Sequence, residues 1–589
     1  MQQYWGYDSF RPLQEESMRA VIGDRDSVVV LPTGGGKSLC FQVPAVCRDG
    51  LAVVVSPLIS LMKDQVDALT DCGVSAAFVN STLSLDEKKQ VAARVKAGEI
   101  RLLYVAPERL VLPQTIDFLK KAGLSFIAID EAHCISQWGH DFRPEYRSLS
   151  MLRDEFPDVA IHAFTATATE DVRDDIAAQL QFEDHEMLVG SFDRLNLNYK
   201  VERRGKDRVG QICEVIDRHK YESGIIYCIS RKDVEQTSSM LNDQGYNTRP
   251  YHAGLSAADR QAAQDAFINE EVDTIVATIA FGMGIDKSNV RYVIHSGMPK
   301  SLENYQQEAG RAGRDGLEAE CCLFYSMGDF VLWQRIIEMN ESDANESAVN
   351  ALQRMANYCT GVVCRHKSLI EHFGQEWDRP DCGACDVCGG DLELIDDSLV
   401  VGQKILSSIV RTGQRFGGEY NALVLKGSSD RRIMNNRHDE LSTYGLLQEH
   451  PQRAIRDWIE QLAGQGFLSR EGEYNTLKVS KTGRQLLKGE VEPRLLKPQV
   501  KEDRPRTVRS SSKEESWDGV DRDLFDNLRQ LRRDKANERG VPPYIVFSDA
   551  ALRDMARRKP ATLEEFREVK GVGDKKLEEY GEDFLAEIN

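Results

Sequence analysis

The sequence lacks an apolar run long enough to cross a membrane, and it lacks an excess of basic residues. Its 589 residues include 75 Lys and Arg against 94 Asp and Glu, which gives a net charge of -19. This balance disfavours a nucleic-acid binder that works through bulk basicity, so any such site must be a local basic or aromatic track. The segment from Met1 to Gly6 shows no basic region followed by an apolar one. We therefore expect no export signal, no membrane partner and a cytoplasmic protein.

The sequence also lacks the paired cysteine framework of a small secreted protein. Six of its 13 cysteines are scattered through apolar or motif segments, which indicates reduced core residues. These are Cys40, Cys47, Cys72, Cys134, Cys213 and Cys228. With 41% hydrophobic residues, the chain is long enough for about four domains with separate cores.

Four other cysteines form a candidate metal site. Three of them follow the pattern Cys-x-x-Cys-x-x-Cys and one precedes it, and the set is Cys364, Cys382, Cys385 and Cys388. Four thiolates suit tetrahedral zinc. A thioredoxin-like redox pair and buried free thiols are the alternatives, but no strand-helix unit surrounds the cluster. His366 is an alternative ligand in place of one thiolate, and Cys359 is a spare thiol.

A glycine-rich turn follows the short apolar run 28–31, and a helix is expected to begin near residue 38. The turn would close backbone amides around phosphates at the helix N-terminus, with Lys37 reaching the β- and γ-phosphates and Ser38 ligating Mg2+. Its nucleotide-binding residues are Thr33, Gly34, Gly35, Gly36, Lys37 and Ser38. Leu31 stands where the strict pattern has glycine, so an ordinary glycine-rich turn is the alternative reading.

An acidic pair, Asp130 and Glu131, closes a second apolar run at residues 126–129. Asp130 would supply a carboxylate to the magnesium shell, and Glu131 would polarise the attacking water. A solvated turn is the alternative. A phosphate cradle followed by a strand-end acidic pair indicates a nucleoside triphosphatase.

Buried strands and helices restart at about Asn196, with apolar runs at 224–228 and 274–277. Two such units predict two α/β lobes with parallel sheets, joined near residues 191–194.

Five ordered segments carry a resemblance to one family. They are FRPLQ at 10–14, PTGGGKS at 32–38, SPLISLMKDQ at 56–65, DEAHCISQWGHDFRP at 130–144 and TATA at 165–168. Together they strongly resemble the bacterial type of RecQ-family DNA helicase, over essentially the whole chain. The resemblance implies ATP, Mg2+ and Zn2+ as cofactors, 3′ to 5′ translocation on single-stranded DNA, and duplex unwinding in recombination and repair. It implies single-stranded and forked or junction DNA as partners, single-strand-binding protein or other repair proteins as candidate partners, a nucleoid-associated location and a monomer.

The resemblance also assigns residues around the nucleotide and the DNA. Tyr7 would stack on adenine, while Arg11 and Gln14 would make polar contacts with it. The segment after the acidic pair suits base stacking and phosphate contact through Trp138, Phe142 and Arg143. A hydrophobic loop packed on the lobe is the alternative for that segment.

Residues 280–287 and 307–315 resemble the last two motor motifs of the family. Within the second of them, Arg314 is the expected arginine finger and Arg311 its partner at the phosphates. A solvated arginine pair is the alternative.

The predicted fold is α/β, with two tandem RecA-like parallel-sheet lobes, a helical zinc-binding module, a winged-helix domain and a small helical C-terminal HRDC domain. The expected ranges are 1–194 and 195–344 for the lobes, 345–396 for the zinc module, 397–490 for the winged helix, 491–516 for a flexible linker and 517–589 for HRDC. The Pro- and Ser-rich composition of the linker cannot fix a rigid interface with the winged helix, so HRDC is expected to fold independently.

Two further DNA contacts are predicted in the C-terminal modules. Tyr474 lies at the tip of a predicted hairpin and would stack on the first exposed base pair as a separation pin, with ordinary wing structure as the alternative. In HRDC, Tyr544 and the basic residues 557–559 would contact a single strand, and residues 571–576 would offer amides and lysines to a phosphate. For the basic cluster, a solvated helix end is the alternative.

Two other functions stay open at this point, an RNA helicase with the same tandem lobes and a non-catalytic nucleic-acid-binding scaffold. Intact Lys37, Asp130, Glu131 and Arg314 argue against the scaffold.

Overall fold

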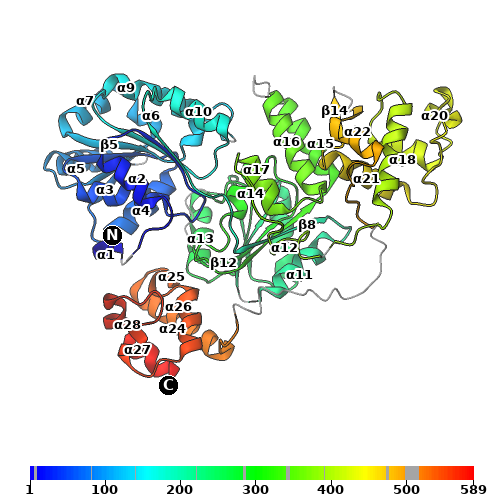
Figure 1. Ribbon diagram of the computed structural model, residues 1–589. Helices are drawn as coiled ribbons and strands as arrows, with labels where there is room; N and C mark the ends of the chain where they lie inside the picture. The colour runs from blue at the N-terminus through cyan, green and yellow to red at the C-terminus, as the bar shows by residue number, and fades with distance from the viewer. Residues whose placement is uncertain are drawn as a thin grey trace.

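A computed structural model describes residues 1–5, 9–80, 83–139, 141–220, 222–282, 287–339, 345–390, 392–471, 476–497 and 517–589. Two α/β lobes lie next to each other, the winged helix extends from the second lobe, and the C-terminal helical domain lies below them in the view of Figure 1. No helix among these residues combines the length and the apolarity that a membrane crossing needs.

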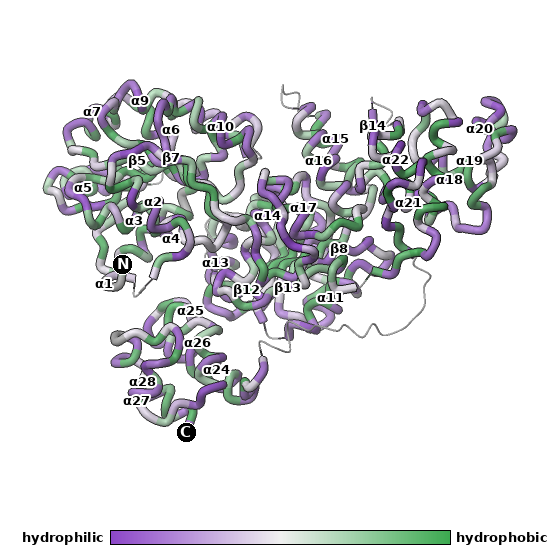
Figure 2. Tube along the Cα trace, in the orientation of Figure 1, coloured by the Kyte–Doolittle hydropathy of each residue, from purple (hydrophilic) through white to green (hydrophobic). Residues whose placement is uncertain are grey.

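The first lobe is built on a seven-stranded parallel sheet in the order β3-β4-β2-β5-β6-β1-β7. Its strands are β1 Ser27–Val30, β2 Leu51–Val55, β3 Ala76–Val79, β4 Leu102–Val105, β5 Leu124–Ile129, β6 Ile161–Thr165 and β7 Glu186–Val189. Its helices are α1 Gln2–Trp5, α2 Gln14–Ile22, α3 Lys37–Cys47, α4 Ile59–Asp71, α5 Leu85–Lys96, α6 Pro107–Leu110, α7 Pro113–Ala122, η1 Ala132–Ile135, α8 Pro144–Arg147, η2 Ser148–Met151, α9 Leu152–Glu155 and α10 Glu170–Gln179. All residues of β1 and β2 are buried, as is usual for a parallel sheet with helices on both faces. Figure 2 shows the hydropathy along the chain.

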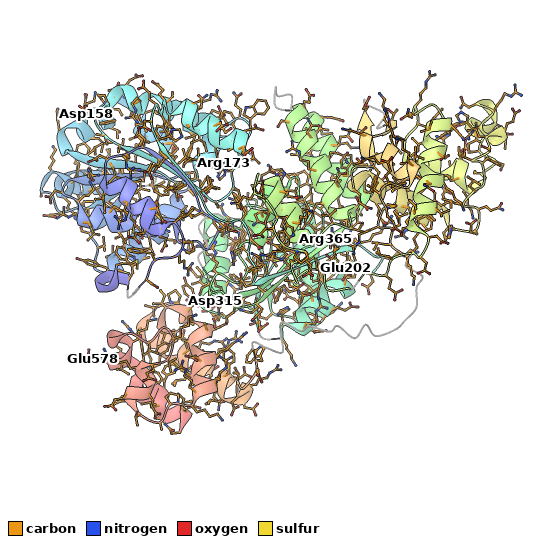
Figure 3. The ribbon with its side chains drawn as sticks, in the orientation of Figure 1. Asp158, Arg173, Glu202, Asp315, Arg365 and Glu578 are labelled. Carbon is orange, nitrogen blue, oxygen red and sulfur yellow. The ribbon has the colours of Figure 1, made fainter. Side chains whose placement is uncertain are left out.

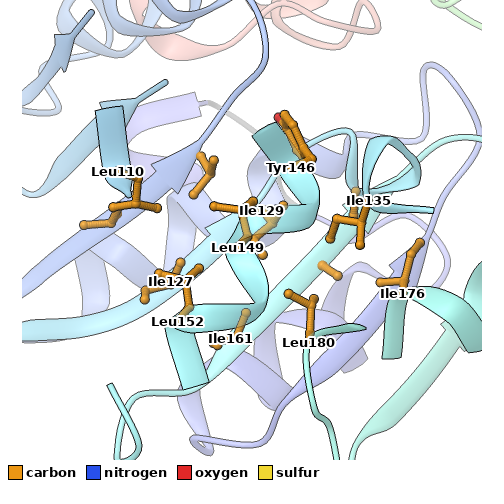
Figure 4. Close-up of a cluster of buried hydrophobic side chains, with 14 of the residues drawn as sticks. Leu110, Ile127, Ile129, Ile135, Tyr146, Leu149, Leu152, Ile161, Ile176 and Leu180 are labelled. Atoms are coloured by element: carbon orange, nitrogen blue, oxygen red, sulfur yellow. The ribbon is translucent and has the colours of Figure 1, made fainter. Parts of the chain in front are cut away.

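One core cluster of the first lobe supports the strand that ends at the acidic pair (Figure 4). Ile127 and Ile129 of β5 are fully buried in it, together with Ile135, Tyr146 and Leu149 from the segments that follow. The cluster therefore fixes both the end of β5 and the chain that leaves it.

The second lobe repeats this plan with a six-stranded parallel sheet in the order β10-β11-β9-β12-β13-β8. Its strands are β8 Leu197–Arg203, β9 Ser223–Tyr227, β10 Thr248–Tyr251, β11 Thr274–Ala277, β12 Val290–His295 and β13 Ala319–Tyr325. Its helices are α11 Arg208–Arg218, α12 Arg231–Asp243, α13 Ala257–Ile268, α14 Leu302–Ala309 and α15 Met327–Met339. The two-lobe prediction is confirmed.

The zinc-binding module, with α16 Asn345–Thr360 and α17 Arg365–His372, packs on the outer strand of the second sheet. The backbone N–H of Tyr199 in β8 donates to the Ala384 carbonyl at 3.2 Å, and the backbone N–H of Asp386 donates to the Tyr199 carbonyl at 3.0 Å. Arg365, buried and labelled in Figure 3, donates to both carboxylate oxygens of Asp386 at 2.8 and 3.0 Å. This buried pair holds the cysteine-bearing loop against the lobe.

The winged helix contains α18 Ser398–Arg411, α19 Gly418–Lys426, α20 Arg431–Asn435, η3 His438–Glu440, α21 Gln452–Gly464, β14 Leu468–Glu471, β15 Thr476–Val479 and α22 Lys481–Lys488. The antiparallel pair β14 and β15 is the predicted hairpin, and its tip with Tyr474 lies outside the described residues. The expected start of the linker at 491 is wrong. Leu495 is fully buried in this core, and the Leu496 carbonyl accepts from the Trp458 indole at 2.8 Å. The prediction failed because the Pro-rich composition of the segment does not reveal a single buried leucine.

The HRDC domain consists of α24 Arg522–Arg539, α25 Pro543–Val546, α26 Asp549–Arg558, α27 Leu563–Arg567 and α28 Asp574–Ile588 around its own apolar core. This core is separate from those of the other domains, and the domain docks on the second lobe. Independent folding of HRDC stays a prediction. Arg532 of α24 is fully buried and donates to Glu270 at 3.0 Å and to Asp549 at 2.7 Å.

Other charges complete this docking site. Lys287 lies 3.5 Å from Glu270, and Asn289 donates to Glu270 at 2.8 Å. Arg291 pairs with Asp315, which Figure 3 places on the side of the lobe facing HRDC. The interface is thus a buried ion network, which no property of the linker predicts.

Candidate active site

The predicted phosphate-binding turn lies between β1 and α3. Gly34 and Gly36 have φ values of +83° and +78°, a conformation that favours glycine. A Cβ added to Gly36 would lie only 2.3 Å from Nε2 of Gln14, so a side chain there would displace the Gln14 amide. The turn ends at Lys37, the first residue of α3, where backbone amides favour phosphate.

The two residues expected to contact adenine lie against the carbonyl oxygens of this turn. Gln14 is buried and donates to the Gly36 carbonyl at 3.1 Å, and the Arg11 guanidinium donates to the Gly34 carbonyl. These bonds shape the turn, and adenine recognition by Arg11 and Gln14 stays a prediction. Tyr7 lies outside the described residues.

The acidic pair follows directly at the end of β5. Asp130 N donates to the Val55 carbonyl at 2.9 Å, and the Asp130 carbonyl accepts from the Tyr146 hydroxyl at 3.0 Å. Burial first, and the Glu131 carboxylate next, raise the pKa of Asp130 to about 7, while Lys37 opposes them. Glu131 has φ of +51°, and its buried Oε2 accepts no hydrogen bond from the described residues, although Nδ1 of His133 lies 3.4 Å from it. A carboxylate pair with one oxygen so placed fits a magnesium ion and a reacting water.

His133 joins this pair to the segment 165–168, a link that the sequence does not predict. Its Nδ1 lies 2.9 Å from Oγ1 of Thr165 and 3.4 Å from Oε2 of Glu131. Burial lowers the pKa of His133 to about 4, so the ring is neutral at pH 7. The only signal in the sequence is that both residues belong to family motifs.

The second lobe presents its arginines to the turn. A Cβ added to Gly34 would lie 3.4 Å from Cγ of Arg314, so the Arg314 segment touches the turn across the cleft. Arg311 is buried and donates to the Gly282 carbonyl within its own lobe. A cavity of about 410 Å³ lies between the two segments, and its lining includes Arg11, Gly35, Arg194 and Arg314.

The segment 136–144 leaves the acidic pair and reaches the surface. The Trp138 side chain is 63% exposed, so the packed-loop alternative does not hold for this ring. Phe142 is half-buried, and Arg143 donates to the Pro57 carbonyl at 3.2 Å and pairs with Asp141 at 3.0 Å. Arg143 thus ties the segment to the lobe, and Trp138 is the ring open to a ligand.

The four predicted zinc ligands come together. The sulfur atoms of Cys364, Cys382, Cys385 and Cys388 all lie within 4.8 Å of one another. This donor set fits a tetrahedral zinc ion. His366 has Nδ1 2.8 Å from Asp193, and its Nε2 lies 3.1 Å from the Leu197 carbonyl and 3.4 Å from the Ala384 carbonyl, so oxygen atoms engage both ring nitrogens and His366 is not a member of the sulfur cluster.

The basic cluster 557–559 of HRDC is engaged within its own domain. Arg558 pairs with Asp554 at 3.0 Å, and Lys559 pairs with Asp521 at 2.7 Å. Arg557 donates to a backbone carbonyl at 3.1 Å. DNA contact by these residues and by Tyr544, which is half-buried, stays a prediction.

Family models match the chain in the order expected for these domains. They are the DEAD/DEAH box helicase model at 11–175, the helicase conserved C-terminal domain at 207–316, the RecQ zinc-binding model at 327–389, the RQC domain at 395–504 and the HRDC domain at 521–588. The protein "ATP-dependent DNA helicase RecQ" of Haemophilus influenzae is 41% identical over 99% of this chain and 94% of its own length. The chain belongs to the RecQ family of helicases. A Bacillus subtilis RecQ is 41% identical over 99% of this chain and 97% of its own, and a mimivirus protein named as a putative RNA helicase is 37% identical over 79% and 86%.

Membership of the RecQ family confirms the predicted order of modules. The zinc-binding and RQC models cover the cysteine cluster and the winged helix. The RQC match runs to 504, in agreement with the packing of residues 491–497 on the winged helix.

Proposed function

We propose that this chain is an ATP-dependent DNA helicase that moves along single-stranded DNA and separates duplex DNA. One observation supports this above the others: the phosphate-binding turn of one lobe and Arg314 of the other line the same cavity, in a chain of the RecQ family. ATP bound there would contact both lobes, so its hydrolysis would change how tightly they close.

Each side chain has a role in that reaction. Lys37 would hold the β- and γ-phosphates, Glu131 would polarise the attacking water through Oε2, and Arg314 would neutralise charge that develops on the transferred phosphoryl group. Ser38 and Asp130 would hold Mg2+. The metal held there would supply positive charge that offsets the charge of the phosphates. Arg311 would be the partner of Arg314 at the phosphates, and it donates to the Gly282 carbonyl within its own lobe.

Zinc would have a structural role. Cys364, Cys382, Cys385 and Cys388 would hold it beside β8, and none of them lines the cavity next to the phosphate-binding turn. The cluster is placed to stabilise the module, and no step of hydrolysis needs it.

Turnover of ATP with and without single-stranded DNA tests the chemistry. Lys37→Ala should abolish DNA-stimulated hydrolysis, and Glu131→Gln should bind ATP but hydrolyse it very slowly. Glu183→Gln, an exposed residue of the same lobe, is the matched control and should behave as the wild type. Near-normal turnover by Glu131→Gln would exclude Glu131 as the group that polarises water.

The substrate needs its own test. Partial duplexes with a 3′ or a 5′ tail would establish the expected 3′ to 5′ polarity, and forked, gapped and four-way substrates would establish the preferred DNA structure. RNA of the same sequence separates a DNA helicase from an RNA helicase, because only the latter would keep full ATPase stimulation by RNA. A chain with no turnover on any strand would be the non-catalytic scaffold.

The wider biology is part of the same proposal. We expect work in recombination and repair, a nucleoid-associated monomer, and contacts with single-strand-binding protein or other repair proteins. Pull-down with purified candidates and sedimentation of the chain alone would test these expectations.

A further inference from the structure

Arg194 lies in the segment that joins the two lobes, and its guanidinium bridges them beside the candidate nucleotide site. It donates to four backbone carbonyl oxygens, those of Thr33 at 2.7 Å, Gly310 at 3.3 Å, Ala312 at 2.9 Å and Gly313 at 2.8 Å. The first acceptor belongs to the phosphate-binding turn, and the other three belong to the loop that carries Arg314. One side chain therefore connects the phosphate-binding turn of the first lobe to the Arg314 loop of the second.

The chemistry of this bridge leaves the phosphate site open. The acceptor on the turn is a carbonyl oxygen, so the bond does not use the amide N–H groups that would face phosphate. A guanidinium stays charged in proteins and presents its donors in one rigid plane. Its four bonds thus constrain the orientation of the Arg314 loop relative to the turn as well as their distance.

The loops around Arg194 are closely packed. A Cβ added to Gly310 would lie 3.1 Å from Cβ of Thr33, so the two loops are in direct contact. Asn196, two residues after Arg194, donates to the carbonyls of Gly313 and Leu317 at 2.8 Å each. Asn196 fixes the shape of the Arg314 loop, and Arg194 fixes where that loop sits on the first lobe.

We propose that Arg194 is a positioning residue for ATP hydrolysis, which sets the place of Arg314 relative to the phosphate-binding turn. This rests on the proposed function, because it requires Arg314 to act at the transferred phosphoryl group. Arg194 acts through the backbone carbonyls of both loops. A displacement of about 1 Å at a reacting centre can cost about a hundredfold in rate, so a bridge of this kind matters for turnover.

Arg194→Lys tests the bridge while keeping the charge. A lysine ammonium cannot hold four acceptors in the plane of a guanidinium. We expect DNA-stimulated kcat to fall about a hundredfold, with the KM for ATP within about threefold of the wild type. Arg204→Lys is the matched control, because Arg204 donates to the Ser296 carbonyl at 2.8 Å and to Asp329 within the second lobe alone. It should keep normal turnover.

A double-mutant cycle separates positioning from general stability. If Arg194 acts through Arg314, then Arg194→Lys should lower kcat no further in an Arg314→Ala background. Losses that multiply, a raised KM with unchanged kcat, or an equal loss in Arg204→Lys would each overturn the inference. Should Arg194→Lys fail to fold, Asn196→Ala perturbs the same loop and should show the same lack of additivity.

The cycle also tells the two proposals apart. Normal turnover by Arg314→Ala alone would remove the arginine finger from the proposed function. Loss of turnover in Arg314→Ala, with normal turnover in Arg194→Lys, would leave the finger in place and refute only the role of Arg194.

Discussion

Replacing Glu270 by glutamine should release HRDC from the second lobe. The Glu270 carboxylate is fully buried, lies 3.0 Å from Arg532 and 3.5 Å from Lys287, and has Arg529 and Arg533 at 3.8 Å. These cations hold the pKa of Glu270 well below its ordinary value against the opposing effect of burial. Glutamine keeps the shape of the side chain and removes the charge that they share.

The magnitude follows from the burial of the partners. Breaking a buried ion pair costs about 3 to 5 kcal/mol because it leaves a charge without compensation. Asp549 still pairs with Arg532 at 2.7 Å, so we take the lower end, about 3 kcal/mol, which is roughly a hundredfold in the docking equilibrium. Both faces regain water when HRDC leaves, so the cost appears as undocking and not as unfolding.

Small-angle X-ray scattering of the full chain measures this directly. The radius of gyration should increase in Glu270→Gln, and hydrogen exchange should rise at the face of α24 that carries Arg532. Glu271→Gln removes one charge from the adjacent exposed residue and should leave both signals unchanged. Identical scattering curves for Glu270→Gln and the wild type would refute the view that this network holds the domain.

Four other outcomes are expected. Trp138→Ala should keep basal ATP hydrolysis and most DNA affinity but weaken stimulation by single strands, whereas an equal loss of basal and stimulated rates would indicate a packing defect. Cys385→Ser should lower zinc content and solubility, since a structural zinc contributes roughly 10 to 16 kcal/mol to a small module, and metal analysis that finds no zinc in active wild-type protein would contradict this. Burial lowers the pKa of His162 from 6.5 to about 3, so protonation favours the unfolded chain. The contribution of neutral His162 to the free energy of unfolding should be complete above pH 6.5 and should fall below that pH by about 1.4 kcal/mol per pH unit. Denaturant titration should show a shallower slope for His162→Gln. Truncation after Lys497 should preserve ATPase and unwinding of a forked duplex while changing DNA affinity and substrate choice, and a loss of ATPase would show HRDC to be integral to the motor.

The parts that the sequence predicted are those with local patterns. Apolar runs predicted the buried strands, the glycines around Gly34 predicted the turn, and the spacing of Cys382 and its neighbours predicted a cluster that the structure brings together. In each case the residues that act together are close in the chain or belong to one motif. Local physics is then enough to define them.

The parts that the sequence did not predict depend on contacts between distant segments. Arg194 and Thr33 are 161 positions apart, and nothing near Arg194 marks it as different from an ordinary arginine of a connecting segment. Arg532 and Glu270 are 262 positions apart and belong to different domains. Leu495 was hidden in a different way, because composition averages over a window in which one buried side chain decides the packing.

The pairing of the zinc module with β8 has a consequence for aggregation. β8 is the outer strand of its sheet, and the backbone of Tyr199 bonds to the cysteine-bearing loop at Ala384 and Asp386. If that loop detached, the strand would present open backbone donors and acceptors, which are a template for pairing with another chain. Metal loss would then expose an unpaired edge strand on a lobe that is otherwise folded. Chelator-treated protein should therefore form oligomers rich in β-structure before its lobes melt, and zinc should protect against self-association as well as against unfolding.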